Sequence, residues 1–529
     1  MSQEQATTEG YNFSKSQTTW AMVAIFAVYG TLGYFVQTLT IARPKIAADL
    51  NGMALYSWAV SIPSLFSAMV TLIFGKLSDM YGRRIMLMIS LAICVVGTIM
   101  SALSPSFVFL IVASVVLAVG TGAMMPLVFA VVGDVYPPSQ RSKWIGLLNI
   151  PIGIFSLIGP TMGGWFVDNL NWRYLFWILL PLLVFCLVTV PVGVPSLIQK
   201  GTSRKIDYKG CLLVGIASAT VIIGLSFAGT TYPWASVQVI SLLGVSLLFW
   251  ILFFRAERQT EEPIVDPLVF RNRTFLTIVI ATFLSFFGQM AMMMYFPMFL
   301  QGVQGVSTTV SGLMFTPYSV LMSFLGVFVG FILARSKRYK WMYILGLGIV
   351  TADMFAIVFL KAETPVFWSV VVCTVAGLGL GALPTVNTTV IQNVLPKRML
   401  GVAMGASFFC MSMSIAISPP ILDSAKNVTY GKTLDASLPH ELQGLADDAT
   451  MAAIRNQRVL LSNPSMADLK ARFDKMGPQG PALFDKTVDA IRNSLESALR
   501  SVFWIGAITM LLAFLLISTI PEVSLDNES

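Results

Sequence analysis

Charge is scarce in this sequence. Only 11% of the 529 residues are Asp, Glu, Lys or Arg, while 56% are hydrophobic. A soluble globular protein carries roughly 25% charged residues, so this composition excludes an ordinary soluble chain. Histidine is scarcer still, because the one histidine, His440, lies in a polar stretch outside every long apolar run. A proton relay built from histidines inside a membrane is therefore excluded.

The sequence is also poor in the residues that mark disulfide frameworks and enzymes. It has five cysteines, each inside an apolar run, where a buried small hydrophobic side chain is the expected role. It contains neither a phosphate-binding G-x-x-x-x-G-K-[ST] loop nor a metal-ligand cluster or nucleophile triad. We therefore expect no enzyme activity, no cofactor and no metal site.

Apolar runs of about 20 residues follow one another along the chain, each long enough to cross a bilayer core of ~30 Å as a helix. The first run, 20–41, is too long for the apolar part of a secretory signal, so we expect it to remain as an anchor. The runs predict an all-α polytopic membrane protein with fourteen spans. The predicted spans are 20–42, 54–75, 85–104, 107–133, 144–167, 174–195, 210–229, 235–254, 274–299, 309–334, 341–360, 366–391, 400–421 and 501–520.

The basic residues predict the orientation of these spans. With the N-terminus inside, the inner turns hold most of the lysines and arginines, and the short outer loops hold only Arg43, Lys45, Arg173 and Lys361. Short loops rich in Lys and Arg stay on the cytoplasmic side. We therefore expect a multi-pass protein of the bacterial cytoplasmic membrane with both termini in the cytoplasm. The net charge of +8 follows from this bias and does not indicate nucleic-acid binding, which needs a concentrated basic face.

One segment, 423–499, has the composition of a soluble protein. Stretches such as ATMAAIRNQRVLL carry apolar residues at helical spacing, which predicts amphipathic helices that cover the outer face. Two roles stay open for this segment: a surface cap without chemistry, or a gate or docking element for a partner.

Residues 75–84, GKLSDMYGRR, form a dense charged turn between the second and third spans. Gly75 and Gly82 permit a tight turn and a close approach of helices. A generic basic inner turn accounts for the arginines, but not for the spaced pattern G-x-L-x-D-x-x-G-R-R.

This pattern resembles the signature turn of the major facilitator superfamily. The resemblance implies a conformational latch, in which Asp79 meets the positive N-terminal end of the span that starts near Gly401 and Arg83 pairs with Asp134. Such a latch closes the cytoplasmic side of two rocking halves. The residues assigned to it are Gly75, Asp79, Gly82, Arg83, Arg84, Asp134 and Arg141.

The fifth span contains a second motif, IGPTMGG, with Gly159, Pro160, Gly163 and Gly164. Small residues let membrane helices pack closely, and a proline inside a span permits a bend. The motif resembles the G-P-x-x-G-G pattern of the exporter branches of the same family. A generic glycine-rich helix contact is the alternative interpretation.

Together with NWRYLFW at 171–177 and the fourteen spans, these motifs resemble the fourteen-helix drug:proton antiporter branch. The resemblance implies the major facilitator fold, with two six-helix bundles and two inserted helices. The implied parts are a cytoplasmic N-tail (1–19), an N-terminal bundle (20–195), the inserted helices with their linkers (196–273), a C-terminal bundle that includes the outer segment (274–520) and a cytoplasmic C-tail (521–529).

The chain departs from this branch at two charged positions. The first span has Phe35 where the branch usually has an acidic residue, and the fourth span has Val116 where it usually has arginine. Both intramembrane charges that the family links to proton coupling are therefore missing. Asp353 is the one carboxylate well inside a predicted span, which makes it the candidate for proton coupling; a packed, hydrogen-bonded acid is the alternative.

The resemblance also implies that the first, fourth, ninth and twelfth spans line the transport pathway. Their side chains would form a neutral cavity with aromatic rings, methionines and a few hydrogen-bonding groups. Flexible methionines suit a site that accepts varied shapes, although a methionine stripe is equally compatible with simple packing. The candidate cavity residues are Tyr34, Gln37, Thr38, Gln289, Met292, Met293, Tyr295, Phe296 and Asn387.

The sequence thus favours a secondary active exporter of amphiphilic or lipophilic compounds, with multidrug efflux by proton antiport as the main hypothesis. The expected partners are a lipophilic small molecule, protons and the lipid bilayer, without an obligatory protein partner. Two alternatives stay open: a proton-independent exporter or flippase of one lipid or metabolite, and a membrane sensor that binds a substrate without moving it.

Overall fold

The computed structural model describes most of the chain. The described residues are 15–52, 55–56, 58–135, 144, 147–194, 207–229, 231–260, 269–336, 338–395, 400–439, 441–442, 447–456, 459–461, 463–476 and 479–522. They contain fourteen long helices. These are α1 (Lys15–Asp49), α2 (Trp58–Tyr81), α3 (Arg83–Ala102), α4 (Phe107–Val135), α6 (Asn149–Asn169), α7 (Tyr174–Gly193), α8 (Tyr208–Phe227), α9 (Val237–Glu257), α10 (Arg273–Met298), α11 (Thr308–Ser336), α12 (Lys340–Val358), α13 (Val366–Val394), α14 (Leu400–Ser437) and α17 (Gly480–Ser518).

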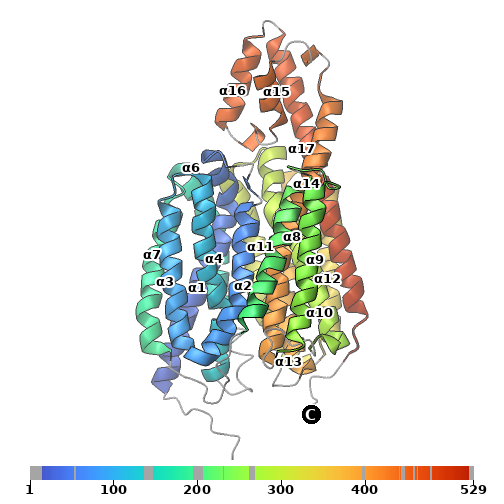
Figure 1. Cartoon of the computed structure of the whole chain (residues 1–529). Coiled ribbons are helices and arrows are strands. Elements are labelled where there is room, and N and C mark those ends of the chain that lie inside the picture. The colour runs from blue at the N-terminus through green and yellow to red at the C-terminus, as the bar shows by residue number, and fades with distance from the viewer. Residues whose placement is uncertain are drawn as a thin grey trace, which may run out of the picture.

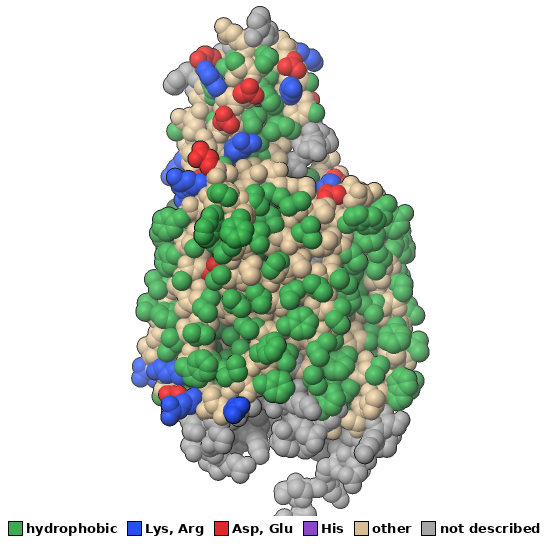
Figure 2. Space-filling view, turned by 180° about the vertical axis from the view of Figure 1, so that it is seen from behind, with side chains coloured by type: hydrophobic (Ala, Val, Ile, Leu, Met, Phe, Trp, Pro, Cys, Tyr) green, Lys and Arg blue, Asp and Glu red, His purple; other side chains and the backbone are tan. Residues whose placement is uncertain are grey.

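Thirteen of these helices are long and apolar enough to cross a membrane, and α2 adds a shorter apolar stretch, Trp58–Thr71. Hydrophobic side chains cover the middle of the molecule as a broad green belt, and charged side chains gather towards its two ends (Figure 2). The all-α, polytopic fold predicted from the apolar runs is confirmed. The division of the chain into a tail, two bundles and an inserted pair stays an interpretation.

Local sequence signals begin and end several helices. The side chains of Asp207, Ser236 and Asn272 accept hydrogen bonds from backbone amides in the first turns of α8, α9 and α10, as capping residues do. Between α2 and α3 the chain turns at Gly82, whose φ is 94°. A side chain is strained at this φ, so glycine is required where the charged turn changes direction.

The helices pack as two groups with a pair beside them (Figure 1). α1 packs on α6 and α7, α4 on α2 and α3, and α3 on α7; we call α1 to α7 the N-terminal half. α10 packs on α14 and α17, α13 on α11 and α12, and α12 on α17; we call α10 to α17 the C-terminal half. α8 and α9 pack on each other. The two halves meet most extensively where α6 packs on α11 and α2 packs on α14, and α1 adds smaller contacts with α10 and α11.

Two helices run beyond the lengths that the sequence predicted. α14 continues to Ser437, past the predicted end at 421, and α17 begins at Gly480 rather than near 501. Pro419 and Pro420 followed by charged residues are typical of a helix end, but the helix continues through them.

The extensions of α14 and α17 rise above the apolar belt and join the short helices α15 (Asp448–Arg455) and α16 (Asn463–Asp474). These elements stand at the top of Figure 1, opposite the C-terminus. We call this side the cap end and the opposite side the tail end.

Candidate functional site

The contact between α6 and α11 is a seam of polar side chains that joins the two halves. The helices run antiparallel, and three pairs meet along them. Ser156 and Ser323 lie 2.6 Å apart, measured between their hydroxyl oxygens. Thr161 and Thr316 lie 3.4 Å apart in the same way. Nearest the cap end, the backbone amide of Thr309 donates to a carboxylate oxygen of Asp168 at 2.9 Å.

The middle of the seam continues into α1. The Gln37 amide donates to the Ser156 hydroxyl at 2.6 Å, so Gln37, Ser156 and Ser323 form a hydrogen-bonded row from α1 through α6 to α11. All three residues are buried. Because a buried polar group without a partner is costly, this row holds α1, α6 and α11 in register.

A second glutamine contacts α11 from within the C-terminal half. The Gln289 amide on α10 donates to the Tyr318 hydroxyl at 3.2 Å and lies 3.5 Å from the Met322 sulfur. Tyr318, Met322 and Ser323 share one stretch of α11, so Gln289 contacts this helix directly and Gln37 is linked to it through Ser156. We call Gln37, Ser156, Ser323, Gln289 and Tyr318 the central polar group.

The other predicted cavity residues contact their own half. Tyr34 donates to the backbone carbonyl of Leu175 on α7 at 2.6 Å. Thr38 is buried, and its hydroxyl has no hydrogen-bond partner among the described residues. Asn387 on α13 donates to Thr282 on α10 at 3.2 Å and accepts a hydrogen bond from Tyr343 on α12. These contacts place α1 against α7, and α13 against α10 and α12.

The candidates on α10 differ in their surroundings. Tyr295 is fully buried and donates to the backbone carbonyl of Pro419 on α14 at 3.3 Å. Phe296 lies in an aromatic cluster with Phe299 and Phe503. Met292 is buried and Met293 is half-buried. Their role in binding a substrate stays a prediction.

The glycine motif of the fifth span lies where α6 meets two other helices. A methyl group added to Gly159 would lie 3.0 Å from the Gln37 Cβ atom, and one added to Gly163 would lie 2.5 Å from the Thr38 carbonyl oxygen, both on α1. A methyl group on Gly164 would lie 3.0 Å from the Thr309 Cα atom on α11. Pro160 lies in the same helix. The motif therefore lets α6 approach both α1 and, across the halves, α11.

The residues of the predicted latch lie in and around α2, α3 and α4. Gly75 and Asp79 lie in α2 and Asp134 in α4, but the side chains of both aspartates, as well as all of Arg141, lie outside the described residues. Arg83 donates to the Ser78 hydroxyl. Arg84 is half-buried at the start of α3. The contact of Asp79 with the start of α14 in the other half and the pairing of Arg83 with Asp134 within the N-terminal half stay predictions.

Asp353, the predicted proton-coupling residue, lies in α12 with only 4% of its surface exposed. Its Oδ2 atom accepts no hydrogen bond from any described residue. Asp353 is therefore a buried carboxylate inside a span, and both its role in proton coupling and the alternative of a packed, hydrogen-bonded acid stay predictions.

Sequence reasoning missed a pair of buried charges on α14. Lys426 and Asp423 lie 2.6 Å apart with side-chain exposures of 1% and 8%. The Lys426 ammonium also lies 5.4 Å from the ring centre of Tyr295. The missed signal is an acid and a base three residues apart, which places them on one face of a helix. The pair was missed because the span was predicted to end at 421, before both residues.

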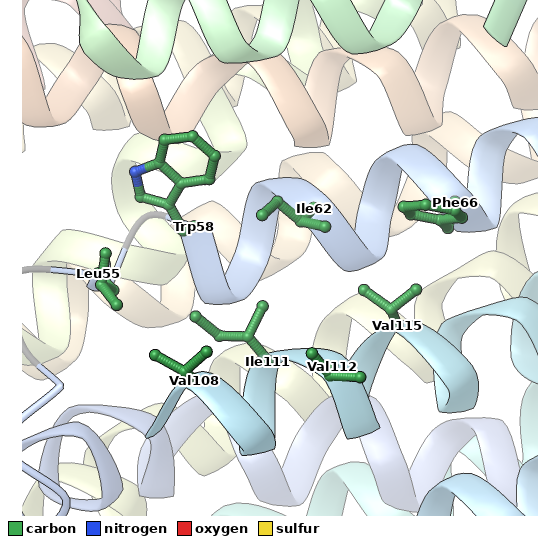
Figure 3. A pocket seen from close by; sticks show the side chains of 8 residues that line it. All are labelled: Leu55, Trp58, Ile62, Phe66, Val108, Ile111, Val112 and Val115. Atoms are coloured by element: carbon green, nitrogen blue, oxygen red, sulfur yellow. The ribbon is translucent and has the colours of Figure 1, made fainter. Parts of the chain in front are cut away.

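A surface hollow differs from the central polar group because its lining is entirely apolar. It has a volume of about 440 Å³ and lies between α2 and α4 (Figure 3). Its lining is apolar, and Phe66, Val108 and Val112 are exposed. Such a surface suits lipid chains rather than a compound that needs hydrogen bonds. Its lining residues are Leu55, Trp58, Ile62, Phe66, Val108, Ile111, Val112 and Val115.

The chain matches the model of a known protein family over most of its length. The model of the Major Facilitator Superfamily matches residues 23–419. The chain is 28% identical to the Multidrug transporter protein MdtP of Bacillus subtilis (strain 168) over 92% of this chain and 90% of that protein. It is 27% identical to Multidrug resistance protein 3 of the same organism, over 89% of each chain.

Two solved structures show the same fold at low sequence identity. One is a bacterial homologue of the human lysosomal transporter Spinster in an inward-facing, unoccupied conformation, with a TM-score of 0.60, 17% identity and coverage of 96% of this chain and 98% of that one. The other is the human organic anion transporter MFSD10, with a TM-score of 0.56, 12% identity and coverage of 94% and 99%.

Proposed function

This chain belongs to the Major Facilitator Superfamily, and on that premise we propose that it is a secondary active exporter of amphiphilic or lipophilic compounds. The observation that carries the proposal is the central polar group, in which Gln37 of the N-terminal half, through Ser156, and Gln289 of the C-terminal half, directly, are hydrogen-bonded to α11. Relatives named as multidrug transporters, similar over almost their whole length, support the same substrate class.

The chemistry of the central polar group fits such compounds. Gln37, Gln289 and Tyr318 offer amide and hydroxyl groups without a formal charge, and the flexible side chains of Met292 and Met293 lie on the same helix as Gln289. A mostly apolar site with a few polar groups fixes the orientation of a ligand but tolerates different shapes. It would not strongly favour an organic cation, because no carboxylate belongs to this group.

Transport by alternating access requires that the halves part at one end while they stay together at the other. The seam between α6 and α11 holds the halves together towards the cap end. At the tail end we propose that Asp79, Arg83, Arg84, Asp134 and Arg141 act as the latch. With the tail end in the cytoplasm of a bacterial cell, the seam closes the outer side, and opening it would release the substrate outwards.

We also propose that Asp353 couples transport to protons. A charged carboxylate inside a membrane is costly, so a carboxylate at such a position either has partners that stabilise it or serves a function. One oxygen of Asp353 is buried without a hydrogen-bond donor among the described residues, so it can exchange a proton without breaking a contact at that oxygen. Phe35 and Val116 occupy the positions where related antiporters have charges, and this favours an uncoupled exporter as the second candidate function.

Purified protein in liposomes tests both functions. A lipophilic fluorescent dye should move against its concentration gradient when a pH gradient is imposed, and Asp353→Asn should abolish the response to the pH gradient while dye binding is kept. Protein-free liposomes are the control. Dye movement that ignores the pH gradient would establish the uncoupled exporter, and binding without movement would establish a sensor in place of a transporter.

A further inference from the structure

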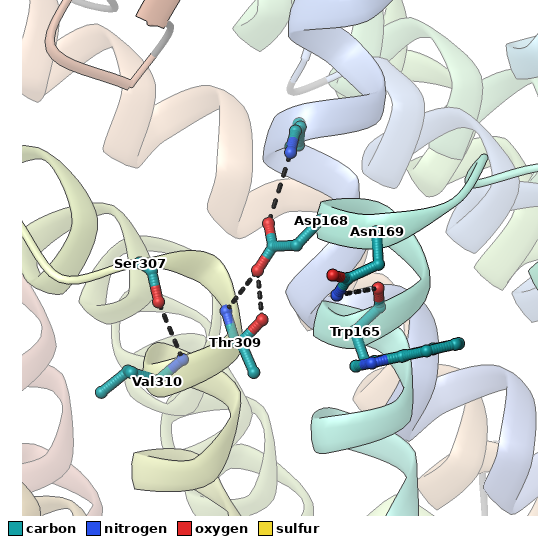
Figure 4. A network of polar contacts seen from close by, with 7 residues as sticks. Trp165, Asp168, Asn169, Ser307, Thr309 and Val310 are labelled. Atoms are coloured by element: carbon teal, nitrogen blue, oxygen red, sulfur yellow. Dashed lines mark hydrogen bonds and ion pairs between the residues drawn. The ribbon is translucent and has the colours of Figure 1, made fainter.

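Asp168, near the end of α6, holds two charged or polar groups from different helices at once (Figure 4). Its Oδ1 atom lies 3.3 Å from the Lys45 ammonium on α1, within the N-terminal half. Its Oδ2 atom accepts from the backbone amide of Thr309 at 2.9 Å and also from the Thr309 hydroxyl, on α11 of the C-terminal half. One carboxylate thus bridges the two halves at the cap end.

The contact on α11 is a helix cap supplied by the opposite half. α11 begins at Thr308, and its first amides have no partner within the helix. The Ser307 hydroxyl accepts a hydrogen bond from the backbone amide of Val310 at 3.3 Å. The Asp168 carboxylate accepts one from the preceding amide, that of Thr309. A negative charge at this end of a helix is also favoured by the helix dipole. When the halves part, α11 loses this cap.

Gly164, one turn before Asp168, allows α6 and α11 to approach closely enough for the cap to form. A methyl group on Gly164 would lie 3.0 Å from the Thr309 Cα atom and 3.2 Å from the Thr308 carbonyl oxygen. The first turn of α11 therefore lies directly against α6. A glycine and a carboxylate four residues apart share one helix face, so the same face of α6 provides both the close contact and the cap.

We infer that Asp168 is the positioning residue that sets how often the halves open at the cap end. This inference rests on the alternating access proposed above and adds a residue to it. It is the counterpart of the predicted role of Asp79 at the tail end, since each carboxylate would cap a helix of the opposite half. Lys45, in the same half as Asp168, forms the ion pair that keeps the Asp168 side chain directed towards the seam.

Distances between spin labels on Leu103 and Phe367 test this assignment. Both side chains are well exposed; they follow α3 and begin α13 at the cap end, one in each half. Loss of a helix cap shifts an equilibrium by roughly fivefold. We therefore expect Asp168→Ala to raise the population of long distances about fivefold, and Asp168→Asn, which keeps an accepting oxygen but not the charge, to raise it less.

Asp49→Asn is the matched control. Asp49 ends α1 and lies in the field of Lys45 and Arg173, while burial raises its pKa; it has no hydrogen bond to α11 among the described contacts. The control should leave the distances unchanged. The assignment would be overturned if Asp168→Ala kept the wild-type distances or if Asp49→Asn shifted them equally. Because the distances are measured without dye or pH gradient, this outcome is independent of the liposome experiment.

Discussion

Replacing Asp423 by asparagine should unfold or strongly destabilise the protein. The carboxylate lies 2.6 Å from the Lys426 ammonium, and this is the most deeply buried ion pair of the described residues. Removal of one partner of a buried pair typically costs about 3–5 kcal/mol, because the remaining charge keeps its desolvation penalty. The Tyr295 ring beside Lys426 can offset only part of this, since a cation–π contact contributes about 2 kcal/mol when desolvated.

The double replacement Asp423→Leu with Lys426→Met is the matched control. Exchange of a whole buried pair for apolar side chains of similar size is often neutral or stabilising. Thermal unfolding of the detergent-purified protein should therefore show a large loss for Asp423→Asn and recovery in the double variant. Equal loss in both variants would mean that the residues contribute separately. A stable Asp423→Asn variant would contradict the burial of the pair.

The second large effect is expected at Gly163. A methyl group there would lie 2.5 Å from the carbonyl oxygen of Thr38, and backbone atoms of a packed helix cannot turn away as a side chain can. Gly163→Ala should therefore force α1 and α6 apart, at a cost of roughly 3 kcal/mol, the upper part of the range for overpacked sites. The shift should appear as a lower midpoint of thermal unfolding.

Gly244→Ala provides the comparison, because Gly244 lies in the apolar helix α9 and has nothing within 4 Å of an added methyl group. This change should be neutral, or stabilising by up to about 1 kcal/mol, since alanine favours a helix over glycine. If Gly163→Ala were as stable as Gly244→Ala, the close contact between α1 and α6 would not exist in the folded protein.

Much of the fold could be predicted because membrane helices must satisfy their backbone groups internally and expose apolar side chains to lipid. The apolar runs therefore mark the helices directly. The glycine motif was also predictable: Gly159, Gly163 and Gly164 lie at close helix contacts, two of them against α1 and one against α11.

The contacts between the halves could not be predicted in the same way. Asp168 follows the last predicted residue of the fifth span, and nothing local distinguishes it from an ordinary loop carboxylate. Its partners Lys45 and Thr309 are far away in the sequence. Likewise, Gln37 and Gln289 were predicted to share a cavity, but the residues that connect them to α11, Ser156, Ser323 and Tyr318, carry no sequence signal beyond being polar inside apolar runs.

The end of α14 was hidden for a physical reason. Charged residues after two prolines indicate the end of a span, because a lone buried charge is costly. Asp423 and Lys426 remain inside the helix because they neutralise each other across one turn. A prediction that considers each charged residue separately does not include the stabilisation of Asp423 by Lys426.

In the proposed export cycle, the halves separate along the α6–α11 seam. Thr161 and Thr316 face each other across that seam. In a background without the native cysteines, Thr161→Cys with Thr316→Cys should form a disulfide under oxidation. Dye export should then fall to the level of empty liposomes and return on reduction. Full export with the cross-link complete would contradict the account.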